Sequence, residues 1–206
     1  MVTSPAHLER LSGAVELKSL KIVLTGIPNI EATATAGVYS WIQMSTGRVG
    51  SNLIRCIDVD PVAILYTSGS TGLSKGVVLS HQNLMTGAES VNSYLHTGRD
   101  DVILALLPLS FDAGLSQLTT GIAAGARIVL HNYIRAQEVE RVCAKNAITA
   151  ITGVPPLWNQ LSAVPWNDEA RRSISVFANT GGQMPMIGAS CIPINQWDPC
   201  RRDGAG

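Results

Sequence analysis

Short apolar runs recur along most of the chain and are separated by longer stretches with apolar residues at helical spacing. The runs are rich in valine, isoleucine and leucine, which is typical of buried strands. The strands that they predict cover residues 20–25, 62–67, 76–79, 102–106, 127–130, 148–152 and 174–178. The pattern is weaker in residues 28–60, where we expect a loop with a little local structure. It disappears in residues 186–206, where we expect neither helix nor strand.

The stretches between these runs predict helices. The first begins after Ser80, whose side chain can accept a hydrogen bond from an orphan backbone N–H, and continues to about residue 96. Its apolar face, interpreted as core packing, consists of Leu84, Ala88, Val91 and Leu95. Further helices are predicted over 114–124 and 136–145, and from Pro155-Pro156, because proline suits the first helical turn. Alternating strands and helices predict an α/β fold with a mainly parallel sheet and flanking helices.

The composition supports a buried core and narrows the partners. Hydrophobic residues make up 46% of the 206 residues and charged residues 15%, below the roughly 25% of an average soluble domain. Fifteen basic and fifteen acidic residues give no net charge, which argues against whole-chain attraction to nucleic acid and leaves a local basic patch open. No apolar run reaches the roughly 18 residues that span a bilayer, and the start is unlike a signal peptide.

Several residue types that often form sites have no suitable spacing here. The four cysteines contain no Cys-x-x-Cys pair and are interpreted as reduced thiols of a cytoplasmic protein. The histidines at 81, 96 and 131 show no metal-ligand spacing. Asp100 and Asp101 are interpreted as solvated loop acids. No metal site is therefore identified.

The most informative segment is residues 66–76 (YTSGSTGLSKG). Its three glycines permit positive φ angles and close approach of a ligand, and consecutive N–H groups in such a loop can bind an anion. Hydroxyl groups flank the glycines, and Lys75 adds a positive charge suited to a polyphosphate. A flexible Gly/Ser linker is the alternative, but a linker needs neither the lysine nor strands on both sides. A Walker loop is excluded, because Ser74 precedes the lysine and Gly76 follows it.

The stretch YTSGSTGLSKGV, followed by LSHQNL, resembles the phosphate loop of the adenylate-forming superfamily. This superfamily includes acyl-CoA synthetases, luciferases and peptide-synthetase adenylation domains. The resemblance implies that the loop holds the β- and γ-phosphates of ATP while a carboxylate attacks the α-phosphate. The residues to which it assigns this role are Thr67, Ser68, Gly69, Ser70, Thr71, Gly72 and Lys75.

Three later segments resemble the same superfamily in the expected order: residues 107–112 (LPLSFD), 153–157 (GVPPL) and 179–185 (NTGGQMP). Taken singly, each also reads as an ordinary turn, helix start or glycine pair. The resemblance assigns an acyl and adenine pocket to Phe111, Val154, Pro155, Gly181, Gly182 and Gln183. The resemblance covers roughly residues 18–185. In detail, the sequence of these segments is most similar to bacterial acyl-CoA ligases of the exosortase-associated type.

Complete members of the superfamily carry a larger region before the loop, a Tyr-Gly-x-Thr-Glu motif, a ribose-binding aspartate and a lid with a catalytic lysine. None of these is found in the chain, so no catalytic residue is assigned. The expected fold is a partial N-terminal domain of an adenylate-forming enzyme, over residues 1–185, with an irregular tail over 186–206. A reading-frame change near residue 185 is one hypothesis for the tail, and genomic DNA compared in all frames tests it.

The implied reaction joins a small-molecule carboxylic acid to ATP, giving an acyl-adenylate and pyrophosphate, and then a thioester with CoA. Mg²⁺ is expected with ATP, and no nucleic acid or membrane span is expected. We expect turnover by this chain alone to fall below that of a complete ligase. A non-catalytic remnant that binds nucleotide weakly, or a folded interaction module, stays open as an alternative. An unrelated nucleotide-hydrolysing enzyme is disfavoured by the absent Walker pattern.

Overall fold

The structure, a computed structural model, describes residues 2–11, 22–25, 38–42, 55–68 and 74–183. The chain divides into two compact units, Met1–Arg55 and Cys56–Gly206, which are described separately. Residues 186–206, expected to be an irregular tail, lie outside the described ranges. Within those ranges, no helix is both long and apolar enough to cross a lipid bilayer.

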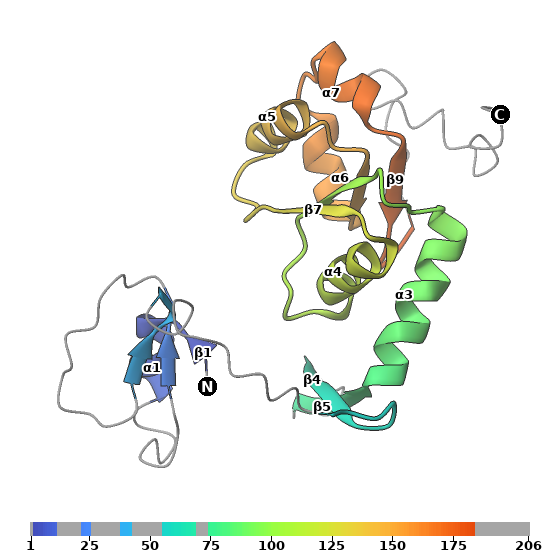
Figure 1. Ribbon diagram of the computed structural model, residues 1–206. Helices are drawn as coiled ribbons and strands as arrows, with labels where there is room; N and C mark the ends of the chain where they lie inside the picture. The colour runs from blue at the N-terminus through green and yellow to red at the C-terminus, as the bar shows by residue number, and fades with distance from the viewer. Residues whose placement is uncertain (1, 12–21, 26–37, 43–54, 69–73, 184–206) are drawn as a thin grey trace. The chain divides into compact units, whose positions relative to one another are not determined.

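The first unit contains a small parallel sheet (Figure 1). Its strands are β1 (Val2–Thr3), β2 (Ile22–Leu24) and β3 (Val38–Ser40), in that order, and the helix α1 (Pro5–Leu11) follows β1. The strand β2 lies within the run predicted at 20–25. The strand β3 lies within the weakly patterned region, where a little local structure was expected. The sequence pattern did not predict β1 or α1.

The second unit begins with a hairpin and continues as alternating helices and strands. The hairpin strands β4 (Pro61–Ser68) and β5 (Ser74–Ser80) pair antiparallel and form a two-stranded sheet of their own. The remaining elements are α3 (His81–Leu95), β6 (Val102–Ala105), α4 (Asp112–Ala124), β7 (Arg127–Leu130), α5 (Ala136–Asn146), β8 (Ala150–Gly153), α6 (Pro155–Ser162), α7 (Asp168–Ser173) and β9 (Val176–Asn179).

Local sequence signals explain where α3 begins and ends. The Ser80 hydroxyl accepts a hydrogen bond from the Asn83 N–H at 3.2 Å, and the Asn83 side chain accepts one from the Ser80 N–H at 3.0 Å. This reciprocal pair satisfies two orphan donors at the helix start. The helix ends at His96, whose φ of 51° is left-handed. The prediction of a helix capped by Ser80 is confirmed.

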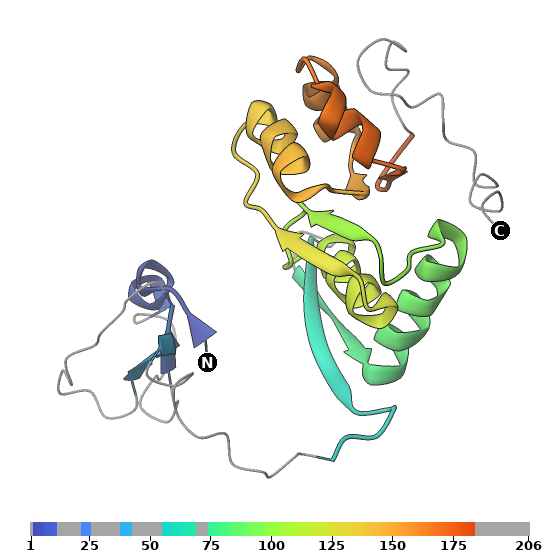
Figure 2. The ribbon, with the colours of Figure 1, turned by 45° about the horizontal axis from the view of Figure 1, so that its top comes forward.

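A four-stranded parallel sheet forms the centre of the second unit, in the order β7-β6-β8-β9. Helices α3 and α4 lie on one side of it and α5, α6 and α7 on the other (Figures 1 and 2). The expected parallel sheet with flanking helices is confirmed. The strands β8 and β9 begin two residues later than the apolar runs at 148 and 174, since Ile148 and Ile174 still close the preceding helices.

Each face of this sheet has its own packing. On the α5–α7 side, Leu104 and Ile151 are fully buried beside Val139, Trp158 and Leu161. The Trp158 and Phe177 rings meet edge to face, with centroids 5.8 Å apart. On the other side α4 approaches the strands closely at Gly121. A Cβ atom there would lie 2.6 Å from Ile128 Cγ1, so only glycine permits this approach.

Candidate functional site

The hairpin sets the ends of the predicted phosphate loop against each other. In its register Thr67 is opposite Lys75 and Ser68 is opposite Ser74. The Thr67 hydroxyl donates a hydrogen bond to the Lys75 carbonyl oxygen at 3.5 Å. Directly opposite residues of an antiparallel pair project on the same side. The Thr67 and Lys75 side chains, both exposed, therefore share one side of the hairpin.

The structure places only part of that predicted loop. Thr67, Ser68 and Lys75 end the two strands, whereas Gly69, Ser70, Thr71 and Gly72 lie outside the described residues. Gly76 has an extended backbone within β5 and does not adopt a positive φ. A Cβ atom on Gly76 would come within 3.0 Å of Ile64 Cγ2 and 3.4 Å of Tyr66 Cε1. The Cβ position of Gly76 is therefore crowded by two side chains of β4, although the residue itself is exposed. Close approach of a ligand to its backbone stays a prediction.

The second predicted region lies at the carboxyl edge of the four-stranded sheet. After β6 the chain crosses through α4 to β7 on one side, and after β8 it crosses through α6 and α7 to β9 on the other. The adjacent strands β6 and β8 are thus left in opposite directions. In α/β sheets such a switch point opens a crevice, and ligands bind there.

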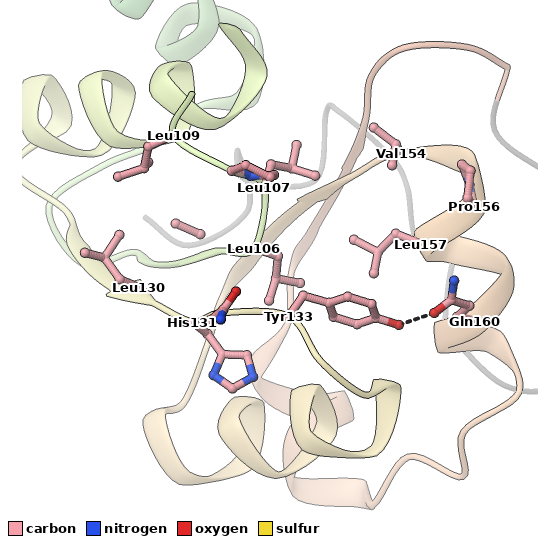
Figure 3. A pocket seen from close by; sticks show the side chains of 13 residues that line it. Leu106, Leu107, Leu109, Leu130, His131, Tyr133, Val154, Pro156, Leu157 and Gln160 are labelled. Atoms are coloured by element: carbon pink, nitrogen blue, oxygen red, sulfur yellow. Dashed lines mark hydrogen bonds between the residues drawn. The ribbon is translucent and has the colours of Figure 1, made fainter. Parts of the chain in front are cut away.

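A pocket of about 530 Å³ opens at this edge. Its apolar lining comes from the segments after β6, β7 and β8, and Figure 3 shows Leu109 and Leu130 across the pocket from Pro156 and Leu157. The full lining consists of Ala105, Leu106, Leu107, Pro108, Leu109, Leu130, His131, Asn132, Tyr133, Val154, Pro156, Leu157 and Gln160. The Tyr133 hydroxyl donates to Gln160 Oε1 on α6, and burial raises the pKa of Tyr133.

Four of the residues predicted for the acyl and adenine pocket meet beside this cavity. A Cβ atom on Gly181 would lie 3.7 Å from Val154 Cγ1, and one on Gly182 would lie 3.3 Å from Pro155 Cγ. The glycine turn has φ angles of 74° and 157° at Gly181 and Gly182. The Asn179 side-chain amide closes it by donating to the Gly182 carbonyl at 2.7 Å. Val154 also lines the pocket, so it joins the turn to the cavity.

The other two predicted residues lie apart from this contact. Phe111 precedes α4 as its N-cap residue, is 60% exposed, and does not line the pocket. Gln183 follows the glycine turn and is exposed. The loop that carries Phe111 is nevertheless held by a hydrogen bond, because the Phe111 N–H donates to the Pro108 carbonyl oxygen at 3.1 Å.

Close packing between this loop and α4 requires a glycine. A Cβ atom on Gly114 would lie 2.0 Å from the Pro108 carbonyl oxygen, which is far inside any allowed contact. The absent side chain lets residues 107–109 lie directly on the first turn of the helix. Since Leu107, Pro108 and Leu109 line the pocket, Gly114 helps to set the pocket's wall.

The sequence analysis missed one buried polar residue at this edge, Gln117 of α4. It is 5% exposed. Its amide nitrogen donates to the carbonyl oxygens of Leu104 (3.3 Å) and Thr152 (3.4 Å), and its amide oxygen accepts from the Leu107 N–H at 3.3 Å. A polar residue at a core position of an amphipathic helix is the signal that could have identified it.

The opposite edge of the sheet holds a second polar network, which corrects the interpretation of Asp101. This residue is 6% exposed and is not a solvated loop acid. Its carboxylate accepts from the Thr149 hydroxyl at 2.8 Å and from the Gly98 N–H at 2.8 Å. The Thr149 hydroxyl in turn accepts from the Val102 N–H at 2.9 Å. The network joins the starts of β6 and β8.

The described residues offer no metal-binding cluster, and the Cys143 thiol is not activated. Within them, no group of three or more His, Cys, Asp or Glu side chains could hold a metal ion. Cys143 is fully buried in the core, and burial, with a smaller effect of the Glu140 carboxylate, raises the pKa of its thiol to about 12. A neutral, enclosed thiol is a packing residue and not a nucleophile.

Comparison with known proteins identifies a family whose model matches most of the chain. The model of the family described as AMP-binding enzyme matches residues 6–203. The chain is 32% identical to 4-coumarate–CoA ligase 5 of Oryza sativa subsp. japonica over 76% of its own length, which is 29% of the ligase. It therefore spans less than a third of that curated relative.

Two solved structures have a similar fold. The N-terminal domain of FACL13 from Mycobacterium tuberculosis, crystallised with an inhibitor, has a TM-score of 0.67 and 22% identity, over 88% of this chain and 49% of that one. ATP-bound MatB from Rhodopseudomonas palustris has a TM-score of 0.64 and 23% identity, over 88% of this chain and 35% of that one. The fold is that of the N-terminal domain of adenylate-forming enzymes.

Proposed function

Because the chain belongs to the family of AMP-binding enzymes, we propose that it acts in the ATP-dependent activation of a carboxylic acid. A carboxylate oxygen attacks the α-phosphorus of ATP, the bond from that phosphorus to the bridging oxygen breaks, and pyrophosphate leaves. The thiol of CoA then attacks the acyl carbon and displaces AMP. The family match over residues 6–203 carries this proposal, and the relative named 4-coumarate–CoA ligase supports the CoA step.

We propose that the turn of the β4–β5 hairpin holds the outer phosphates of ATP. Thr67, Ser68 and Lys75 would act there with the residues between them, Gly69, Ser70, Thr71 and Gly72. The pairing of Thr67 with Lys75 supports this assignment, since it puts a hydroxyl and an ammonium group on one side of the hairpin. Hydroxyl and lysine donors suit a polyphosphate.

The adenine and the acyl group are proposed to lie at the carboxyl edge of the four-stranded sheet. The contact of Val154 and Pro155 with the glycine turn at Gly181 and Gly182 supports this, as does the apolar pocket that shares Val154. Phe111 and Gln183 are proposed for the same region on the resemblance alone. Such a site acts by positioning two substrates and by stabilising phosphate charge, which needs little covalent chemistry from the protein.

Mg²⁺ is proposed to enter with the nucleotide. Within the described ranges, no group of three or more His, Cys, Asp or Glu side chains could hold a metal ion. The described residues therefore do not fit a resident metal site, and no step is assigned to one. We further propose a cytoplasmic location and membership among the exosortase-associated ligases, both on the sequence pattern.

The test is a product assay on the purified chain with ATP, Mg²⁺, CoA and a panel of fatty and aromatic acids. Pyrophosphate and AMP that form only when an acid is added would support acid activation. Phosphate released without any acid would indicate a nucleotide hydrolase instead. Binding of ATP without release of either product would favour a nucleotide-binding module, and no binding of ATP at all would contradict the proposal.

A further inference from the structure

The strands beside the switch point separate early. The strands β6 and β8 share only the register pairs Ile103↔Ala150 and Leu104↔Ile151. Their outer neighbours continue further, since β6 pairs with β7 up to Ala105↔Leu130 and β8 pairs with β9 up to Gly153↔Asn179. The crevice thus opens where the ladder between β6 and β8 stops, and something other than that ladder must set its width.

Gln117 stands at this point. Its amide bridges the two strands by donating to Leu104 O on β6 and Thr152 O on β8. A primary amide has two N–H donors and one carbonyl acceptor, and Gln117 uses both ends. The orientation of the amide is fixed, because two carbonyls face its nitrogen and the Leu107 N–H faces its oxygen. With 5% exposure, water cannot readily replace these partners.

The third hydrogen bond links this bridge to the pocket. Leu107, whose N–H donates to Gln117 Oε1, is a lining residue. One side chain therefore fixes the spacing of two strands and the backbone of the loop that forms one wall. We infer that Gln117 is a positioning residue of this site, a clamp that keeps the crevice between β6 and β8 formed before a ligand arrives. Its effect on acid binding rests on the proposed function; its effect on the strands and loop does not.

The same strand pair offers a matched control at its other end. The Thr149 hydroxyl accepts from the Val102 N–H at 2.9 Å and donates to Asp101 at 2.8 Å. Removing this network loosens the amino edge of β6 and β8 and leaves the carboxyl edge intact. Gln117→Leu and Thr149→Val each replace a polar group by an apolar one of similar size. If Gln117 acts locally, each variant should change hydrogen exchange only at its own edge of the sheet. A general loss of stability would change exchange at both edges.

Amide hydrogen exchange, followed by NMR on the purified chain, is the experiment. In Gln117→Leu the Leu107 N–H should exchange about tenfold faster, as expected for loss of one buried hydrogen bond, while the Val102 N–H keeps its wild-type rate. In Thr149→Val the Val102 N–H should exchange faster, while the Leu107 N–H keeps its wild-type rate. Equal acceleration of both amides in Gln117→Leu, or an unchanged Leu107 rate, would overturn the clamp.

Two further measurements keep the inference testable if Gln117→Leu does not fold. Gln117→Glu retains an oxygen that can accept from the Leu107 N–H, so in this variant the Leu107 amide should exchange less than about tenfold faster than in the wild-type chain. In the wild-type chain the Gln117 side-chain NH₂ protons should exchange about tenfold more slowly than those of the exposed Gln82 and Gln137. Equal exchange of all three side-chain amides would show that Gln117 makes no lasting bridge.

Ligand binding separates this inference from the proposed function. With 4-coumarate as the probe acid, Gln117→Leu should weaken acid binding about tenfold and leave the binding of inorganic triphosphate unchanged, because the hairpin that carries Lys75 is a separate sheet. Equal loss of both ligands would contradict a positioning role. Failure of the wild-type chain to bind the acid would count against the proposed function alone, since exchange still decides the clamp.

Discussion

Thr67 and Lys75 face each other across the β4–β5 hairpin, and the Thr67 hydroxyl donates to the Lys75 carbonyl oxygen at 3.5 Å. The lysine is therefore held at a fixed place beside the turn by the backbone of two paired strands. An ammonium group in that position would meet the outer phosphates of a bound nucleotide. The first prediction tests this role of Lys75.

Lys75→Ala should weaken ATP binding about tenfold or more and AMP binding much less. AMP lacks the outer phosphates, and a hydrogen bond to a charged group is worth roughly 1.5–3 kcal/mol. Titration calorimetry with each nucleotide measures the difference. Lys145→Ala serves as the control, because Lys145 is an exposed lysine on α5. Equal losses for ATP and AMP in Lys75→Ala would remove Lys75 from the phosphate site.

Gly114→Ala should destabilise the second unit by about 1–3 kcal/mol. The added Cβ would lie 2.0 Å from the Pro108 carbonyl, so either the helix or the pocket loop must move. Gly87→Ala is the matched control, because Gly87 lies in α3 with nothing within 4 Å of the new Cβ. It should stabilise the chain by about 0.5–1 kcal/mol through helix propensity. Urea unfolding measures the free energy of unfolding of both variants. Similar changes in Gly114→Ala and Gly87→Ala would contradict the close packing at Gly114.

Cys143 should resist alkylation in the folded chain at pH 8, and Cys56 should react. The pKa of the Cys143 thiol is about 12, and the side chain is fully buried, whereas Cys56 is exposed. Iodoacetamide labelling, followed by mass spectrometry of the two peptides, gives the comparison. Labelling in urea, where both thiols should react fully, gives the reference. Similar labelling of both thiols in native buffer would show that the core around Cys143 opens readily.

The free energy of unfolding should also depend on Cys143 at alkaline pH. Its pKa is about 12 in the folded chain against an ordinary value of 9.0, so between these values the unfolded state loses a proton that the folded state keeps. Stability therefore falls as pH rises through this window, by at most about 1.4 kcal/mol per pH unit. Below pH 9 the effect vanishes. Cys143→Ala should show a shallower decline, and identical slopes for variant and wild type would contradict the assignment.

The sequence predicted the elements whose signals are local. Apolar runs located most of the strands, and Ser80 marked the start of α3. The phosphate-loop motif located a segment whose two ends belong to paired antiparallel strands. The helix α7 escaped prediction, because its residues DEARRS have no apolar period. It forms because the Asn167 side chain caps it at 2.7 Å and Ala170 packs into the core.

Long-range partners account for what the sequence could not show. Asp101 looks like a surface acid until Thr149, far along the chain, is brought to it by the pairing of β6 with β8. Gln117 likewise becomes informative only when Leu104 and Thr152 arrive from two strands. Of the predicted pocket residues, the contact of Val154 with Gly181 depends on β8 lying beside β9, an order that no local pattern encodes.

The pocket's lining includes core residues, such as Leu106 and Leu157, and also exposed residues at its rim. At the rim, Leu130 is 62% exposed and Leu109 is 42% exposed. Within the sheet, Leu104 on β6 and Ile151 on β8 are fully buried. Exchanging side chains at the two rim positions would alter the cavity at small cost to folding, because surface substitutions usually change stability by no more than about 0.5 kcal/mol. If the proposed function holds, the chain's preference among acids can therefore change through substitutions at the pocket rim, while the packing of the core stays the same.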